Sequence, residues 1–121
     1  MSAANSDIAF ADLANALWDA FDVADGHLQD YGFVSDQTET GLAALDANVW
    51  YLENLDQLPD ELADSLIYLN WYALVRDQIR ALADGKDVDI GRISKPPVGA
   101  MRYLKDNNLG YVVGSLTLLL G

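Results

Sequence analysis

The sequence contains no cysteine, which removes disulfide bonds and thiolate chemistry from consideration. It contains one histidine, His27, so no second imidazole is available to share a metal ion with it. We expect His27 to be a structural residue in a loop or at a helix end. The patterns GxxxxGK[ST], GxGxxG and GxSxG are also absent, and these mark phosphate-binding loops and nucleophile elbows. We therefore expect no catalytic residues, no enzyme activity and no cofactor.

Basic residues are missing from the first 75 positions, which carry fourteen acidic residues. All seven basic residues lie between Arg76 and Lys105, and the formal net charge of the chain is −12. One explanation is adaptation to high salt, in which ionic screening removes most of the repulsion between such charges. The other is a surface that repels or mimics nucleic acid. The missing basic footprint disfavours a sequence-specific DNA-binding protein.

Long hydrophobic runs are missing as well. The densest, residues 66–75, is only ten residues long and is interrupted by Asn70, whereas a membrane-spanning helix needs about 20 apolar residues. The first ten residues have neither the basic nor the apolar region of a signal peptide. With 51% hydrophobic residues the chain can still bury a core, so we expect one soluble folded domain.

Apolar residues recur at helical spacing in three segments. The first helix is predicted to start at Ser6 and to end between Ala24 and Tyr31. The second is predicted to end near Leu58, because Pro59 disfavours helical geometry at the residue before it. Their buried faces are predicted to be Phe10, Leu13, Leu17, Phe21 and Ala24 in the first helix, and Leu42, Leu45, Val49, Leu52 and Leu55 in the second.

The third predicted helix, residues 60–84, has two apolar stripes and further apolar residues beside them. The stripes are Leu62, Leu66, Leu69 and Ala73, and Tyr68, Tyr72, Val75, Ile79 and Leu82; Ile67, Trp71 and Leu74 form a third side. A helix that is apolar nearly all round is buried on more than one side. We therefore expect this helix to be central to a bundle or an interface, and to stop at Gly85.

The positions of glycine and proline indicate where the remaining residues form loops and where they form helices. Residues 85–99 are predicted to form a loop with a short extended piece, and 98–107 a short fourth helix. The uncharged segment 109–121 fits an extended arm better than a helix, because of Gly114 and its β-branched residues, although helical spacing is also present. The expected fold is a mainly α small bundle, with an acidic helical domain at 1–108 and an apolar C-terminal arm at 109–121.

The segment DGKDVDIG, residues 84–91, resembles the start of a calcium-binding loop. Arg92 occupies the position where such a loop needs glycine, and no glutamate closes the loop. A turn is the better interpretation, so we expect no metal site.

Two groups of residues are candidates for contact with another protein chain. An exposed apolar strand is an aggregation hazard, so the arm must pack either onto its own core or onto another chain. The predicted interface residues are Tyr111, Val112, Val113, Leu116, Leu118, Leu119 and Leu120. Arg92, Lys95, Arg102 and Lys105 form a basic cluster that pairs either with the chain's own aspartates or with an acidic neighbour, such as a second copy.

This layout of amphipathic helices, the apolar segment ELADSLIYLNWYALVRDQIRALADG, the loop GKDVDIGRISKPPVG and an uncharged arm resembles the head–tail connector (adaptor) proteins of tailed viruses. The resemblance covers most of the chain and includes no diagnostic motif. It implies a structural protein of the virion, with copies in a dodecameric ring that has portal and tail proteins as partners, and with arms that grip the portal or adjacent subunits. DNA would pass an acidic channel wall without specific binding, and the aspartate excess suggests a halophilic host. The alternative is a cytoplasmic acidic helical interaction protein or antitoxin-like regulator of a halophile.

Overall fold

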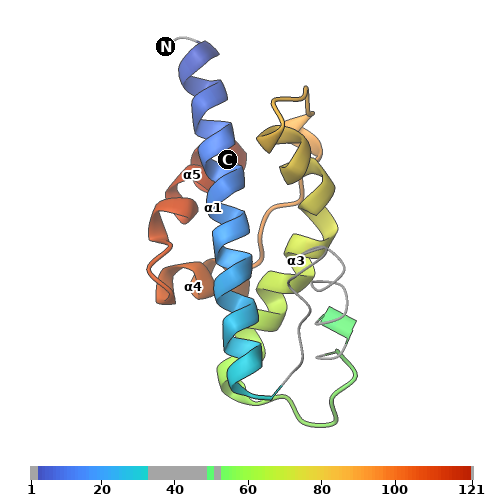
Figure 1. Cartoon of the computed structure of the whole chain (residues 1–121). Coiled ribbons are helices and arrows are strands. Elements are labelled where there is room, and N and C mark those ends of the chain that lie inside the picture. Colours follow the sequence, from blue (N-terminus) through green and yellow to red (C-terminus); the bar gives the residue numbers. More distant parts are fainter. Residues whose placement is uncertain (1–2, 33–48, 51–52, 121) are drawn as a thin grey trace.

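The computed structural model describes residues 3–32, 49–50 and 53–120. Its elements are α1 (Ala3–Asp30), α3 (Asp60–Ala83), the 3-10 turn η1 (Ile90–Arg92), α4 (Val98–Asp106) and α5 (Gly110–Leu120). Helices α1 and α4 each pack against both α3 and α5, so these four helices surround one core (Figure 1). The prediction of a mainly α, small helical bundle is confirmed, and the described ranges contain no strand.

Helix α1 forms one long wall of the bundle. It begins at Ala3, so the predicted start at Ser6 is wrong, because the preceding alanines favour helix and extend it upstream. Its end at Asp30 lies within the predicted window, and Gly32 follows with a φ of 88° that suits glycine. The predicted apolar face is buried at Leu13, Leu17, Phe21 and Ala24, while Phe10 packs half-buried against the core.

Most of the second predicted helix, including Leu42, Leu45 and Leu52, lies outside the described residues. Val49 and Trp50 are helical, and the Val49 side chain is buried in the core. Leu55 packs half-buried against the same core.

Helix α3 occupies residues 60–83, which confirms the third predicted helix. Asp60 and Glu61 lie in its first turn, where carboxylates interact favourably with the helix dipole. Gly85, with a φ of 76°, ends the helix, and the Lys86 amide donates to the Ala81 carbonyl oxygen at 2.8 Å. The second predicted stripe, from Tyr68 to Leu82, is entirely buried, whereas Leu66 and Ala73 of the first stripe are half-buried.

Buried tyrosines join three helices at the centre of the bundle. The Tyr68 hydroxyl donates a hydrogen bond to the Leu17 carbonyl oxygen of α1 at 2.7 Å. The Tyr68 ring stacks on the ring of Tyr103 from α4, with centroids 4.9 Å apart, and the Tyr103 hydroxyl donates to the Ala20 carbonyl oxygen at 3.4 Å. Because both hydroxyls find acceptors, these rings are buried without the cost of unpaired donors.

The segment between α3 and α4 is held against α3 by a tryptophan. The Trp71 indole Nε1 donates to the Ser94 carbonyl oxygen at 2.7 Å. The predicted loop 85–99 contains the turn η1, in which the Asp89 side chain accepts from the Gly91 amide, and the backbone is extended at the flanking residues Asp89 and Ile93. A short side chain that bonds its neighbouring backbone favours such a turn over a strand.

Helices α3 and α4 approach closely at Gly99. A Cβ atom built on Gly99 would lie 2.5 Å from Cδ1 of Ile67, far inside van der Waals contact. The close approach therefore depends on glycine at this position. It brings the first turn of α4, which begins after Pro97, directly onto α3.

The C-terminal segment is a helix, so the predicted extended arm is wrong. Helix α4 ends as expected at the asparagines, where Asn108 adopts a φ of 65° and reverses the chain into α5. Leu109, Val112 and Leu116 then lie on one helical face and are buried. Packing against α1 and α4 thus outweighs the β-branched residues and Gly114, whose local preferences a tertiary context overrides.

We predict that Trp71→Ala lowers the free energy of unfolding by about 3–5 kcal/mol, because it removes a buried aromatic ring and the bond to Ser94. Chemical denaturation monitored by circular dichroism measures the change. The matched control is Leu74→Ala on the same helix, whose side chain is 70% exposed; it should shift stability by no more than about 0.5 kcal/mol. Equal effects of both substitutions would contradict the position assigned to Trp71.

Candidate interaction surface

Three tyrosines in the core are titratable groups that remain protonated. Burial raises the pKa values of Tyr68, Tyr72 and Tyr103 well above the ordinary value, and burial is the largest cause in each case. For Tyr72 the nearby Asp22 carboxylate raises the pKa further, while Arg80 lowers it. A phenol with a raised pKa is a poor acid, so these three groups act as packing elements, and the hydroxyls of Tyr68 and Tyr103 also act as hydrogen-bond donors.

The aspartates of the loop 84–91 do not gather around a common point. Asp89 bonds the Gly91 amide and forms an ion pair with Arg92 at 3.4 Å. No cluster of three or more metal-ligating side chains occurs in the part of the chain that the structure describes. His27 lies half-buried in α1, edge-on to the Tyr103 ring.

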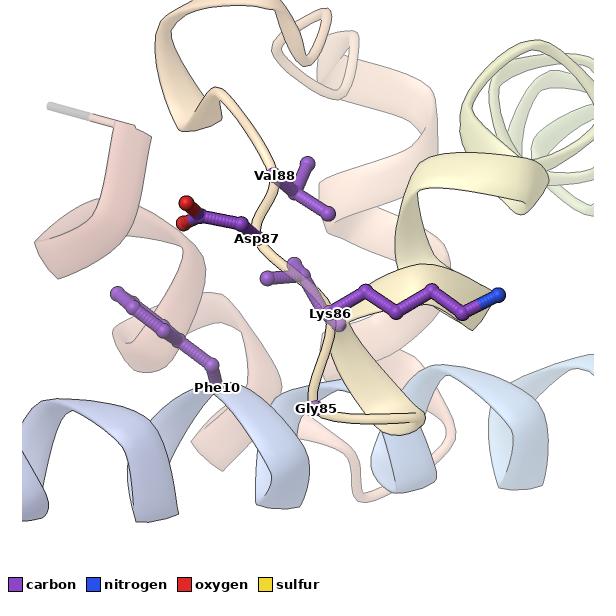
Figure 2. Close-up of a pocket in the computed structure, with 6 residues that line it drawn as sticks. Phe10, Gly85, Lys86, Asp87 and Val88 are labelled. Carbon is purple, nitrogen blue, oxygen red and sulfur yellow. The ribbon is translucent and has the colours of Figure 1, made fainter.

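A hollow of about 360 Å³ lies between α1 and the turn after α3 (Figure 2). Phe10, Leu82 and Val88 provide apolar lining, and Asp87 provides a carboxylate. Figure 2 shows that the Lys86 side chain extends away from Phe10 and Asp87. Among the described residues, the hollow therefore presents apolar surface, one carboxylate and a lysine that extends away from it.

Two apolar grooves flank the segment Lys95–Pro97. The first, here called the α3 groove, has a volume of about 320 Å³ and is lined by Ile67, Asn70, Trp71, Leu74, Ser94, Lys95 and Pro97. The second, the α5 groove, has a volume of about 180 Å³ and is lined by Lys95, Pro96, Met101, Leu116, Thr117 and Leu120. Lys95 lines both, so one exposed ammonium group lies between two apolar surfaces.

The predicted basic cluster is spread around this segment. Arg102 pairs with Asp64 of α3 at 3.2 Å, and Arg92 pairs with Asp89, so two of its members bind the chain's own aspartates. The side chains of Arg102 and Arg92 remain 57% and 83% exposed. Lys95 and Lys105 are also exposed. Surface ion pairs of this kind are weak, so the two arginines remain available to another acidic group.

The seven predicted interface residues of α5 divide between the core and the surface. Val112 and Leu116 are buried in the chain's own core and are therefore not available to another chain. Val113, Leu119 and Leu120 are half-buried against that core. Tyr111 and Leu118 are 60% and 89% exposed. Only the outer face of α5 is open to a partner.

Two exposed apolar residues near the α3 groove were not predicted as contact residues. Leu74 is 70% exposed and Val98 is 73% exposed. The sequence placed Leu74 on the third side of a helix that is apolar nearly all round, which made it resemble a core residue. The exposed position of Val98 follows from Gly99, because the close approach to Ile67 occurs at that neighbouring residue.

The exposed face of α1 is acidic. Asp12, Asp19, Asp22 and Asp30 are exposed, whereas Asp25 is fully buried and accepts a hydrogen bond from Gln29. Partial burial, followed by repulsion from Asp19 and Asp25, raises the pKa of Asp22 above its ordinary value of 3.8. This face therefore carries electrostatic repulsion in the folded chain.

Comparisons of the sequence with protein-family models and curated proteins, and of the fold with solved structures, find no match. No helix within the described ranges combines the length and apolarity that crossing a membrane requires.

We predict that Leu116→Ala destabilises the fold by about 2–5 kcal/mol, because it leaves a cavity in the core. The matched substitution Leu118→Ala, on the exposed side of the same helix, should change stability by no more than about 0.5 kcal/mol. Thermal and chemical denaturation compare the two. A larger effect at Leu118 would show that α5 packs with a different face against the bundle.

We predict that Asp22→Asn stabilises the fold slightly at pH 7, by about 0.5 kcal/mol or less, because the side chain is largely exposed. A carboxyl whose folded-state pKa is raised binds its proton more tightly in the folded state, so ionisation of Asp22 destabilises the fold as pH rises. The advantage of the variant should disappear as pH falls below 3.8, where wild-type Asp22 is protonated in both states. Melting curves of both proteins at pH 7 and pH 3 test the sign.

Proposed function

We propose that this protein is a structural assembly subunit that forms a homo-oligomer, and that the assembly is a head–tail connector ring of a virion. The observation that supports a homo-oligomer is the exposed, uncharged outer face of α5. Tyr111 and Leu118 project from a helix that contains no charged residue. Such a face favours contact with another protein surface over exposure to water.

The charge distribution supports the proposal that the assembly is a connector ring. The first 75 residues carry fourteen acidic residues and no basic residue, and the described face of α1 exposes several of these acids. Binding to DNA depends on basic contacts with phosphate, so an acidic channel wall would let DNA pass without adhering. The basic residues and the exposed apolar residues would then form the surfaces that dock on portal and tail proteins.

The helical form of α5 changes how such a subunit would contact its neighbours. An extended arm that grips another chain is not present, because residues 110–120 form a helix packed on α1 and α4. The outer face of this helix takes the place of the arm in the proposal. Contacts between subunits would therefore join preformed surfaces.

A cytoplasmic acidic interaction protein, such as an antitoxin-like regulator, is the second candidate. The observation that favours it is the burial of Val112 and Leu116, which makes the described helices a self-contained bundle. This candidate predicts a monomer or dimer, whereas a connector predicts a large ring.

We predict that the purified protein forms a large homo-oligomer in molar salt, and that Leu118→Glu converts it to smaller species without altering its melting temperature. Leu118 is 89% exposed, so a carboxylate there should disturb a contact between chains and leave the fold intact. The matched control is Gln57→Glu, which adds the same charge at an exposed loop position.

Light scattering after size-exclusion chromatography, in molar and in 0.1 M salt, measures the oligomer. A wild-type protein that remains monomeric or dimeric at both salt concentrations would rule out the ring and favour the regulator. Disassembly at 0.1 M salt alone would point to repulsion between acidic surfaces, because the screening length rises from about 3 Å at 1 M salt to about 10 Å at 0.1 M.

A further inference from the structure

Three of the exposed acids of α1 lie along one stripe of the helix. Asp12, Asp19 and Asp30 are separated by seven and eleven residues, spacings that return to the same face of a helix. Val23 lies on this face between Asp19 and Asp30 and is 36% exposed. The stripe is thus an acidic surface with one apolar side chain near its centre.

The α3 groove has the opposite character. Ile67, Leu74 and Pro97 give it an apolar lining, and Lys95 provides an exposed positive charge at the boundary with the α5 groove. Arg102 places a second positive charge on the same stretch of α3, because it pairs with Asp64, which precedes Ile67 by three residues. Its guanidinium holds Asp64 but remains more than half exposed.

We propose that the α3 groove of one copy binds the acidic α1 stripe of a second copy of this chain, an interface that rests on the assembly role proposed above. Val23 of the second copy enters the groove against Leu74 and Pro97. The flanking carboxylates of Asp12, Asp19 and Asp30 meet Lys95 and Arg102 at its edge. Opposite potentials across an interface set its register and select the partner.

Charge complementarity is the reason for choosing a second copy as the occupant. The groove joins an apolar lining to positive charge, so it selects an apolar side chain surrounded by carboxylates. The chain itself presents such a surface on α1, at residues that the fold leaves exposed. A groove of about 320 Å³ accepts an apolar side chain projecting from a helix, while the body of the helix remains outside it.

The proposed contact joins two different surfaces, one formed by α1 and the other by α3 with the segment Lys95–Pro97. A contact between unlike surfaces is head-to-tail, and repetition produces either a closed ring or an open filament. Each added copy offers a new groove and a new stripe, so the interface accounts for assembly beyond a dimer.

Reversal of charge on either surface tests this contact. Lys95→Glu should weaken self-association at least tenfold, and the double substitution Asp12→Lys with Asp19→Lys should do the same, because each places like charges against one another. A 1:1 mixture of the two variants should assemble, since each variant then meets a complementary surface on the other. The matched control is Lys86→Glu, which makes the same charge change at an exposed lysine outside the α3 groove.

Sedimentation velocity at one fixed salt concentration, chosen so that the wild type assembles and melts cooperatively, measures every sample. Recovery in the mixture, with Lys86→Glu unaffected, supports the proposed contact. Assembly of the wild type that neither charge reversal weakens would overturn this contact and leave the assembly role intact. A wild type that is monomeric at every salt concentration would overturn both. Loss of assembly without recovery in the mixture, in variants that melt like the wild type, would also overturn the pairing.

Discussion

The hydrogen bond from the Tyr68 hydroxyl to the Leu17 carbonyl oxygen ties α3 to α1 inside the core, and the rest of the packing is arranged around it. It fixes the ring on which Tyr103 stacks, so α4 is positioned by the same residue. One helical turn away, Trp71 holds the backbone at Ser94 and thereby positions one wall of the α3 groove. A buried polar contact of this kind costs stability if it is broken, which restricts the ways in which the helices can pack.

The unequal charge distribution along the chain becomes a difference between surfaces once the chain folds. Helix α1 comes from the half without basic residues, whereas the segment Lys95–Pro97 and α4 come from the basic end. Arg80 is a basic residue of α3 that contacts α1. Its guanidinium lies 5.8 Å from the centre of the Trp18 ring, so a cation–π interaction links the two helices. The exposed face of α1 thus carries acidic residues without basic ones, while Lys95 from the basic end lies beside the two apolar grooves.

The long apolar repeat of α3 made that helix predictable, because its period persists over 24 residues and ends at a glycine. The C-terminal segment was not predictable in the same way, since strand and helix both place some of its apolar residues on one side. What decides between them is the contact of Val112 and Leu116 with distant helices, which local propensity does not contain. The basic members of the candidate surface could be identified by composition, whereas the grooves beside them depend on Ile67 and Leu74, which the sequence does not distinguish from core residues.

The contact between Gly99 and Ile67 determines how α4 can be aligned along α3. Sliding α4 by one residue would bring Val98 or Ala100 opposite Ile67, and either side chain would force the two helices apart. The alignment of α4 along α3 therefore depends on the absence of a side chain at Gly99. The segment Lys95–Pro97 directly precedes α4, so its position is fixed by the same contact. The position of this surface segment therefore depends on Gly99, whereas its charge depends on other residues. A substitution can thus change the shape of the surface without changing its charge, or its charge without changing its shape.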